Sequence, residues 1–130
     1  MGDGELMANF LAYGAAAMLA LWGIAHAIPT RQVLTGFEPI TADNRRVVLQ
    51  EWLAESFTMW GLAAVVVSVT IASGAATNVS HWLYRVVAGL LIALAVLTSL
   101  TGARTPVIWF KICPALLTAS AALLIAASLV

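Results

Sequence analysis

Residues 50–73 read QEWLAESFTMWGLAAVVVSVTIAS, and this stretch decides the fold class of the chain. Its second part, residues 61–73, carries no charge, and an apolar run of about 20 residues can cross the hydrocarbon core of a bilayer. A backbone in lipid must satisfy its own hydrogen bonds, so the stretch is predicted to be a membrane-spanning helix. Glu51 and Glu55 lie one turn apart near its start, on one helix face. Ionisable groups that enter a membrane are costly and by default indicate a functional site.

Three further apolar stretches accompany this one. The four predicted spans cover about residues 6–28, 47–73, 82–100 and 107–130. Of the 130 residues, 62% are hydrophobic and 9% are charged, whereas soluble domains usually carry about 25% charged residues. A surface so poor in charge must be covered by lipid. We therefore predict an all-α integral membrane four-helix bundle, a single domain over residues 1–130, with antiparallel up-down topology.

The connections between the stretches differ in length and polarity. Residues 29–46 form the only long polar segment and are predicted to be a loop. Near its end, residues 41–44 (TADN) offer an N-cap for the second helix. Residues 74–81 are short and uncharged, and residues 102–106 form a tight turn, which predicts that helices three and four are antiparallel neighbours. The first stretch is interpreted as an uncleaved span, because acidic residues rather than Lys or Arg precede it.

Positive charge is distributed unevenly between the two sides of this arrangement. Arg85 lies on one side, and the other five basic residues flank the first and third connections: Arg31, Arg45, Arg46, Arg104 and Lys111. Under the positive-inside rule, this bias predicts a multi-pass protein with both termini outside and loops 29–46 and 101–106 in the cytoplasm. The expected location is the bacterial inner (plasma) membrane.

The same topology places most polar residues in the cytoplasmic leaflet. The candidate polar site comprises Glu51, Glu55, His26, Arg104 and Lys111, and the candidate pocket walls are Trp22, Trp60, Thr98 and Thr101. At 1.5 Å per residue, Glu55 lies about 12 Å inside the apolar boundary, where a carboxylate needs a partner or a proton. Arg104, Lys111, His26 and Arg45 are the candidate partners. The acidic pair is either part of a structural ion-pair network, a proton-handling or ligand-polarising group, or a lipid-facing group.

Histidine and cysteine counts narrow the chemistry. The single Cys113 excludes an internal disulfide and any C-x-x-C motif, and it is interpreted as a buried thiol. His26 and His81 belong to opposite membrane faces, so they cannot ligate one haem within the chain. His26, with a reference pKa of about 6.5, is either a general acid or base or a donor to a backbone carbonyl. No cofactor or metal is predicted, a bound lipid or quinone fits the composition, and no basic patch indicates nucleic acid.

Three short segments resemble those of small bacterial four-helix membrane proteins: HAIP at residues 26–29, DNRR at 43–46 and EWLAE at 51–55. With four short helices, an aromatic-rich acidic second helix and a polar cytoplasmic layer, the chain resembles DoxX-like small bacterial membrane proteins in architecture. It also faintly resembles the emopamil-binding sterol-isomerase group, in which His, Glu and Trp in a helical bundle handle a lipophilic substrate.

These observations lead to three functional hypotheses. The first is an accessory or structural subunit of a larger membrane assembly, without enzymatic activity, because no recognised catalytic motif is present. The second is a binding protein or enzyme for a lipophilic molecule such as a quinone, an isoprenoid or a sterol-like lipid, with Glu55, Glu51 and His26 facing a cytoplasmic-leaflet pocket. The third is proton-coupled transport, with Glu55 titrating. Expected partners are membrane lipids and other membrane subunits or further copies of the chain.

Overall fold

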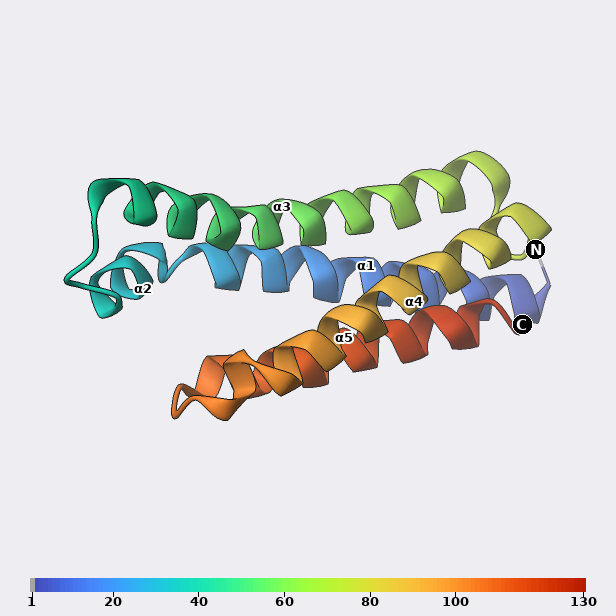
Figure 1. The fold of residues 1–130 in the computed structure, drawn as a ribbon. Helices are drawn as coiled ribbons and strands as arrows, with labels where there is room; N and C mark the ends of the chain where they lie inside the picture. The colour runs from blue at the N-terminus through green and yellow to red at the C-terminus, as the bar shows by residue number, and fades with distance from the viewer. Residues whose placement is uncertain (1) are drawn as a thin grey trace.

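The computed structural model describes residues 2–130, and within this range the chain forms helices and no strand (Figure 1). The elements in chain order are α1 (Asp3–Ala27), α2 (Thr30–Gly36), α3 (Ala42–Ser73), α4 (Asn78–Leu100), the 3-10 turn η1 (Gly102–Arg104) and α5 (Ile108–Ala127). By length and composition, α1, α3, α4 with η1, and α5 are apolar enough to cross a membrane. The predicted all-helical class with four long apolar helices is thus confirmed, and it indicates a multi-pass membrane protein.

The long helices lie lengthwise in a bundle (Figure 1). α1 packs mainly against α3 and α5, and α4 packs mainly against α5. The start of α1 and the C-terminus lie at one end of the molecule, while α2 and the connection from α4 to α5 lie at the other. The pair α1 and α3 diverges from the pair α4 and α5 toward the α2 end.

Small side chains allow the close approach of α1 to its neighbours. Ala8, Ala12, Ala15 and Ala16 follow helical spacing and are at most 3% exposed. In a lipid environment, where apolar burial between helices gains little, such small residues favour association because the backbones can approach closely. The opposite faces of the long helices carry large exposed apolar side chains, among them Phe10, Phe57 and Trp82.

Gly23 gives the closest approach between α1 and α3. A Cβ atom at this position would lie 2.6 Å from Nε1 of Trp60 and 3.2 Å from the carbonyl oxygen of Ser56. The Trp60 indole N–H donates to the carbonyl oxygen of Ala20 at 3.2 Å. The absence of a side chain at Gly23 therefore lets the Trp60 ring lie against α1, and this contact sets the rotation of α3 about its axis.

The segment 29–46, predicted to be the long polar connection between the first two spans, is largely helical. It contains α2 and the first residues of α3. Pro29 precedes α2, where its missing N–H is not needed, and Leu34 is buried on its inner side. A helix of this length shows too little hydrophobic periodicity to be distinguished from a polar loop. The predicted cap of the next helix is confirmed, since Thr41 Oγ1 accepts from the Asn44 N–H at 3.2 Å.

The helices also differ from the predicted apolar stretches at the opposite end. α4 begins at Asn78, before the apolar run near Trp82, because Thr77 caps it by accepting from the Ser80 N–H. The turn before it depends on Gly74, whose φ of 79° is accessible to glycine without strain. Capping residues are polar, so a hydrophobicity pattern underestimates where a capped helix begins.

Candidate functional site

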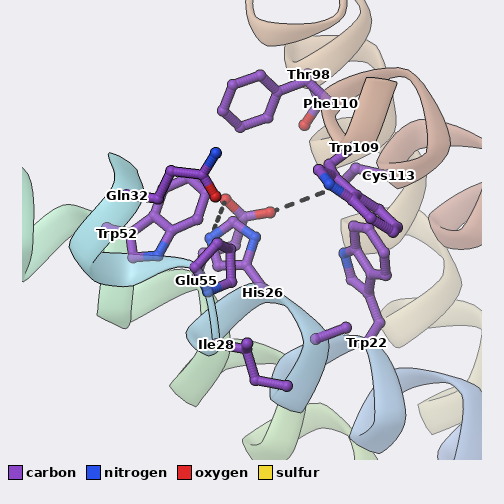
Figure 2. Close-up of a pocket in the computed structure, with 12 residues that line it drawn as sticks. Trp22, His26, Ile28, Gln32, Trp52, Glu55, Thr98, Trp109, Phe110 and Cys113 are labelled. Atoms are coloured by element: carbon purple, nitrogen blue, oxygen red, sulfur yellow. Dashed lines mark hydrogen bonds and ion pairs between the residues drawn. The ribbon is translucent and has the colours of Figure 1, made fainter. Parts of the chain in front are cut away.

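A cavity of about 360 Å³ lies at the α2 end of the bundle, where α1, α3, α4 and α5 all contribute to its wall (Figure 2). Its lining residues are Trp22, Ala25, His26, Ile28, Pro29, Gln32, Trp52, Glu55, Thr98, Trp109, Phe110 and Cys113. The wall is mostly apolar and aromatic, with a few polar groups and no Lys or Arg. This composition is typical of sites for small lipophilic molecules, whose volumes start at about 300 Å³.

His26 and Glu55 face each other across one side of the cavity. Nε2 of His26 lies 3.5 Å from Oε2 of Glu55, within ion-pair distance but without hydrogen-bond geometry. The His26 side chain is 6% exposed and that of Glu55 is 34% exposed. His26 comes from the last turn of α1, which ends before Pro29, and Glu55 comes from the part of α3 packed against that turn.

Trp52 holds the imidazole ring from the other side. It lies one turn before Glu55 on α3, so the two side chains share a helix face. Its indole stacks on His26 with ring centroids 3.8 Å apart and an interplanar angle of 22°. Phe110 of α5 meets Trp52 edge-on, with centroids 5.9 Å apart at 77°. The stack orients the ring of His26 through packing.

Cys113 is a member of the site that the sequence did not single out. Its thiol donates to Oε1 of Glu55 at an S–O distance of 3.6 Å, and the residue is 2% exposed. The two oxygens of Glu55 therefore face partners from two different helices, His26 on α1 and Cys113 on α5. The available signal was that Cys113 lies at the same predicted depth as Glu55, but an apolar stretch around a lone cysteine is usually a packing position.

Several polar atoms of the wall have no hydrogen-bond partner. Among the described residues, Nε1 of Trp22, Nε1 of Trp52 and Nε2 of His26 are buried and unpaired. Figure 2 shows the nitrogen of Trp22 on the side of its ring that faces His26 and Glu55. Buried polar groups in proteins are nearly always paired, so this cluster of unpaired nitrogens around one cavity sets it apart from ordinary packing.

Four of the nine predicted site residues line this cavity: Glu55, His26, Trp22 and Thr98. None of the basic candidates does.

Glu51, one turn before Glu55, is exposed and lies outside the cavity wall. Glu51 accepts a hydrogen bond from the neighbouring side chain of Gln50 at 3.4 Å.

The basic residues lie away from the cavity. Arg104 and Lys111 are exposed and form no ion pair within residues 2–130. Arg45, a candidate partner of the acidic pair, instead binds Glu38 at 2.6 Å, and Arg46 binds Asp43 at 2.8 Å. Long cationic side chains near a membrane surface can reach water, so they need not turn inward to a carboxylate.

The two remaining predicted wall residues lie elsewhere. Trp60 packs between α1 and α3 and lines a separate shallow depression with Tyr13 and Ala20. Thr101 is exposed and donates back to the carbonyl oxygen of Leu97 at 2.8 Å. Thr98, one turn before Thr101, lines the cavity. A small change in helix rotation decides which of two neighbouring residues faces the site, and hydrophobicity alone does not determine that rotation.

A second, more open groove of about 580 Å³ adjoins the cavity beneath α2. The two share the wall residues Pro29, Gln32, Trp52, Trp109 and Phe110. The groove adds Val33 and Phe37 from the α2 region and Val107 from the segment before α5. The cavity thus continues into a mostly apolar space.

The chemistry available at the site is that of a weakly polar pocket. A carboxylate, an imidazole and a thiol lie together, and aromatic rings surround them. Residues 2–130 contain no group of three His, Cys, Asp or Glu side chains that could hold a metal ion.

Comparison of the chain with protein-family models, with curated proteins and with solved structures found no match.

Proposed function

We propose that this protein binds a lipophilic molecule within the membrane, with the polar part of the ligand beside His26 and Glu55. The observation that carries the proposal is the position of this pair: it lies in the wall of an aromatic-lined cavity of about 360 Å³. A purely structural ion pair would be enclosed by packed side chains, whereas this one borders a space of ligand size.

The membrane arrangement belongs to the same proposal. The four long helices cross the bacterial inner membrane as an antiparallel up-down bundle, with both termini outside and segments 29–46 and 101–106 in the cytoplasm. The distribution of basic residues supports this orientation. The candidate ligand classes are quinones, isoprenoids and sterol-like lipids, which reach the cavity from the cytoplasmic leaflet.

The test compares two glutamine variants that differ by one helical turn. Protein purified from membranes in a mild detergent is extracted, and the co-purifying lipophilic molecules are quantified per protein by mass spectrometry. Glu55→Gln is expected to lower the content of one such molecule by about tenfold, because it replaces the carboxylate that faces His26 and accepts from Cys113 and so disturbs the polar side of the cavity. A hydrogen bond to a charged group contributes about 1.5–3 kcal/mol. Glu51→Gln, on an exposed residue of the same helix, is expected to leave the content unchanged.

A structural role for Glu55 predicts a different result. In that case Glu55→Gln lowers the thermal unfolding temperature but leaves the content of every co-purifying molecule, measured at a temperature where the protein is folded, equal to that of the wild type. This outcome would reject the binding proposal. The accessory-subunit and proton-coupled transport hypotheses stay predictions, and no contact within the described residues favours either of them.

A further inference from the structure

We infer that the ligand presents a carbonyl oxygen to Trp22 and His26 and carries no net charge. This inference rests on the proposed binding function and adds the chemical class of the ligand. It follows from the hydrogen-bonding groups of the wall, from their charge and from the shape of the space between them.

The cavity wall contains hydrogen-bond donors without a partner and an acceptor that already has one. The indole N–H groups of Trp22 and Trp52 are donors only, and both are buried without a partner. Nε2 of His26 is also buried and makes no hydrogen bond. The principal acceptor, Glu55, already receives the thiol of Cys113 and lies near His26. A ligand with an acceptor oxygen can accept hydrogen bonds from these unpaired N–H groups, whereas a ligand with donors only cannot.

Charge excludes the anionic acceptors. Carboxylates and phosphates also accept hydrogen bonds, but the cavity wall contains no Lys or Arg to neutralise them. An anion there would lie beside the carboxylate of Glu55 in a weakly polar setting, where like charges repel strongly. A cation would gain from Glu55 and from the aromatic faces, but it would leave the buried indole N–H group of Trp22 unpaired.

The shape of the space favours a flat ring with a substituent. Trp22, Trp52 and Trp109 present indole rings to the cavity (Figure 2), and aromatic pairs prefer stacked or edge-on contacts. The adjoining groove shares Trp52, Trp109 and Phe110 with the cavity, so an apolar chain on the ring can continue into it. Uncharged cyclic carbonyl compounds of the quinone type combine these features.

The test uses two probes of similar shape that differ in their carbonyl groups, 2,3-dimethyl-1,4-naphthoquinone and 2,3-dimethylnaphthalene. The quinone carries methyl groups at both positions where the thiol of Cys113 would otherwise add. Binding to the full-length protein in detergent is measured by titration calorimetry. We expect the quinone to bind at least fivefold more tightly than the hydrocarbon.

Two tryptophan variants locate the interaction. Trp22→Phe retains an aromatic ring but removes the indole N–H, so it is expected to weaken quinone binding about fivefold to tenfold and to leave hydrocarbon binding unchanged. Trp82→Phe is the matched control, because Trp82 is 68% exposed and lies outside the cavity wall. It is expected to change neither affinity.

The outcomes separate this inference from the proposal beneath it. Equal affinities of the wild type for the quinone and the hydrocarbon would overturn the carbonyl inference while leaving lipophilic binding intact. This comparison uses the wild-type protein alone and therefore does not depend on the folding of any variant. Tighter binding of a naphthyl trimethylammonium probe, lost in Glu55→Gln, would overturn it in favour of a cation. Binding of none of the three probes, together with unchanged lipid content in Glu55→Gln, would reject the proposed function itself.

Discussion

At the residue scale, the protein contains two kinds of buried hydroxyl group. Oγ of Ser56 is buried without a partner, next to the contact of Gly23 with Trp60. The hydroxyl groups of Thr70 and Tyr84 are also buried, but they bind each other at 2.6 Å. A buried polar atom without a partner lowers stability, whereas removal of one member of a pair leaves the other unsatisfied.

These two sites give opposite predictions for similar substitutions. Ser56→Ala removes an unsatisfied oxygen and is expected to leave stability unchanged or to raise it by up to about 1 kcal/mol. Thr70→Val keeps the shape of the side chain and is expected to lower stability by about 1–3 kcal/mol, because the Tyr84 hydroxyl loses its partner. Thermal unfolding in detergent measures both, and a larger loss in Ser56→Ala than in Thr70→Val would contradict this account.

At the same scale, the sequence identified only part of the candidate site. The spacing of Glu51 and Glu55 placed two carboxylates on one helix face, and the apolar surroundings of Glu55 indicated that it needs a partner. The partners themselves, His26 and Cys113, come from other helices. Glu55 faces these residues rather than Arg45 because of the reach of the side chains and because Arg45 is already paired with Glu38.

At the element scale, the fit of α1 against α3 depends on one position without a side chain. Gly23 lies where a Cβ atom would come within 2.6 Å of the Trp60 ring and 3.2 Å of a backbone oxygen of α3. Backbone cannot move aside as a flexible side chain can. The two helices would have to separate, and the separation would extend toward His26, one turn further along α1.

Gly23→Ala is therefore expected to lower stability by about 1–3 kcal/mol, the usual effect of overpacking. Gly14→Ala on the same helix is the control, because its Cβ would meet only Leu123 Cδ1 at 4.0 Å, an ordinary contact. Alanine is the better helix former by about 1 kcal/mol, so Gly14→Ala is expected to be neutral or stabilising. The unfolding temperatures of the two variants measure the difference, and equal values would show that the contact of Gly23 with Trp60 does not limit packing.

Helix boundaries were predictable where a cap or an apolar run defined them. A cap within residues 41–44 was expected to begin the second long helix, and the side chain of Thr41 provides it. α2 was missed because its helical character depends on tertiary contact: α2 packs on α3, and its residue Leu34 is buried. A segment of this length has little intrinsic helical stability in isolation.

At the scale of the whole molecule, the proposed topology places the two ends of the bundle on opposite sides of the membrane. Thr35 lies in α2 at one end, and Asn78 begins α4 at the other. Both residues are exposed, and Cys113 is the only cysteine. Single cysteines at these positions can therefore report the orientation in a Cys113→Ser background.

A membrane-impermeant maleimide applied to intact spheroplasts is expected to label Asn78→Cys and to leave Thr35→Cys unlabelled. Thr35→Cys is expected to react only after the membrane is permeabilised, because the basic residues beside segment 29–46 favour a cytoplasmic position. The Cys113→Ser protein without an added cysteine gives the level of non-specific labelling. The reverse labelling pattern would place both termini in the cytoplasm and would contradict the proposed orientation.

The sequence by itself determined the helical class and the four long apolar segments. This follows from composition, because so apolar a chain needs lipid around it and a backbone in lipid must form its own hydrogen bonds. Only the tertiary structure decided which side chains meet. The rotation of each helix depends on local contacts such as Gly23 with Trp60 and Trp52 with His26. Those contacts direct Glu55 toward His26 and Cys113 and leave Glu51 exposed. The spacing of the two glutamates in the sequence does not distinguish between them.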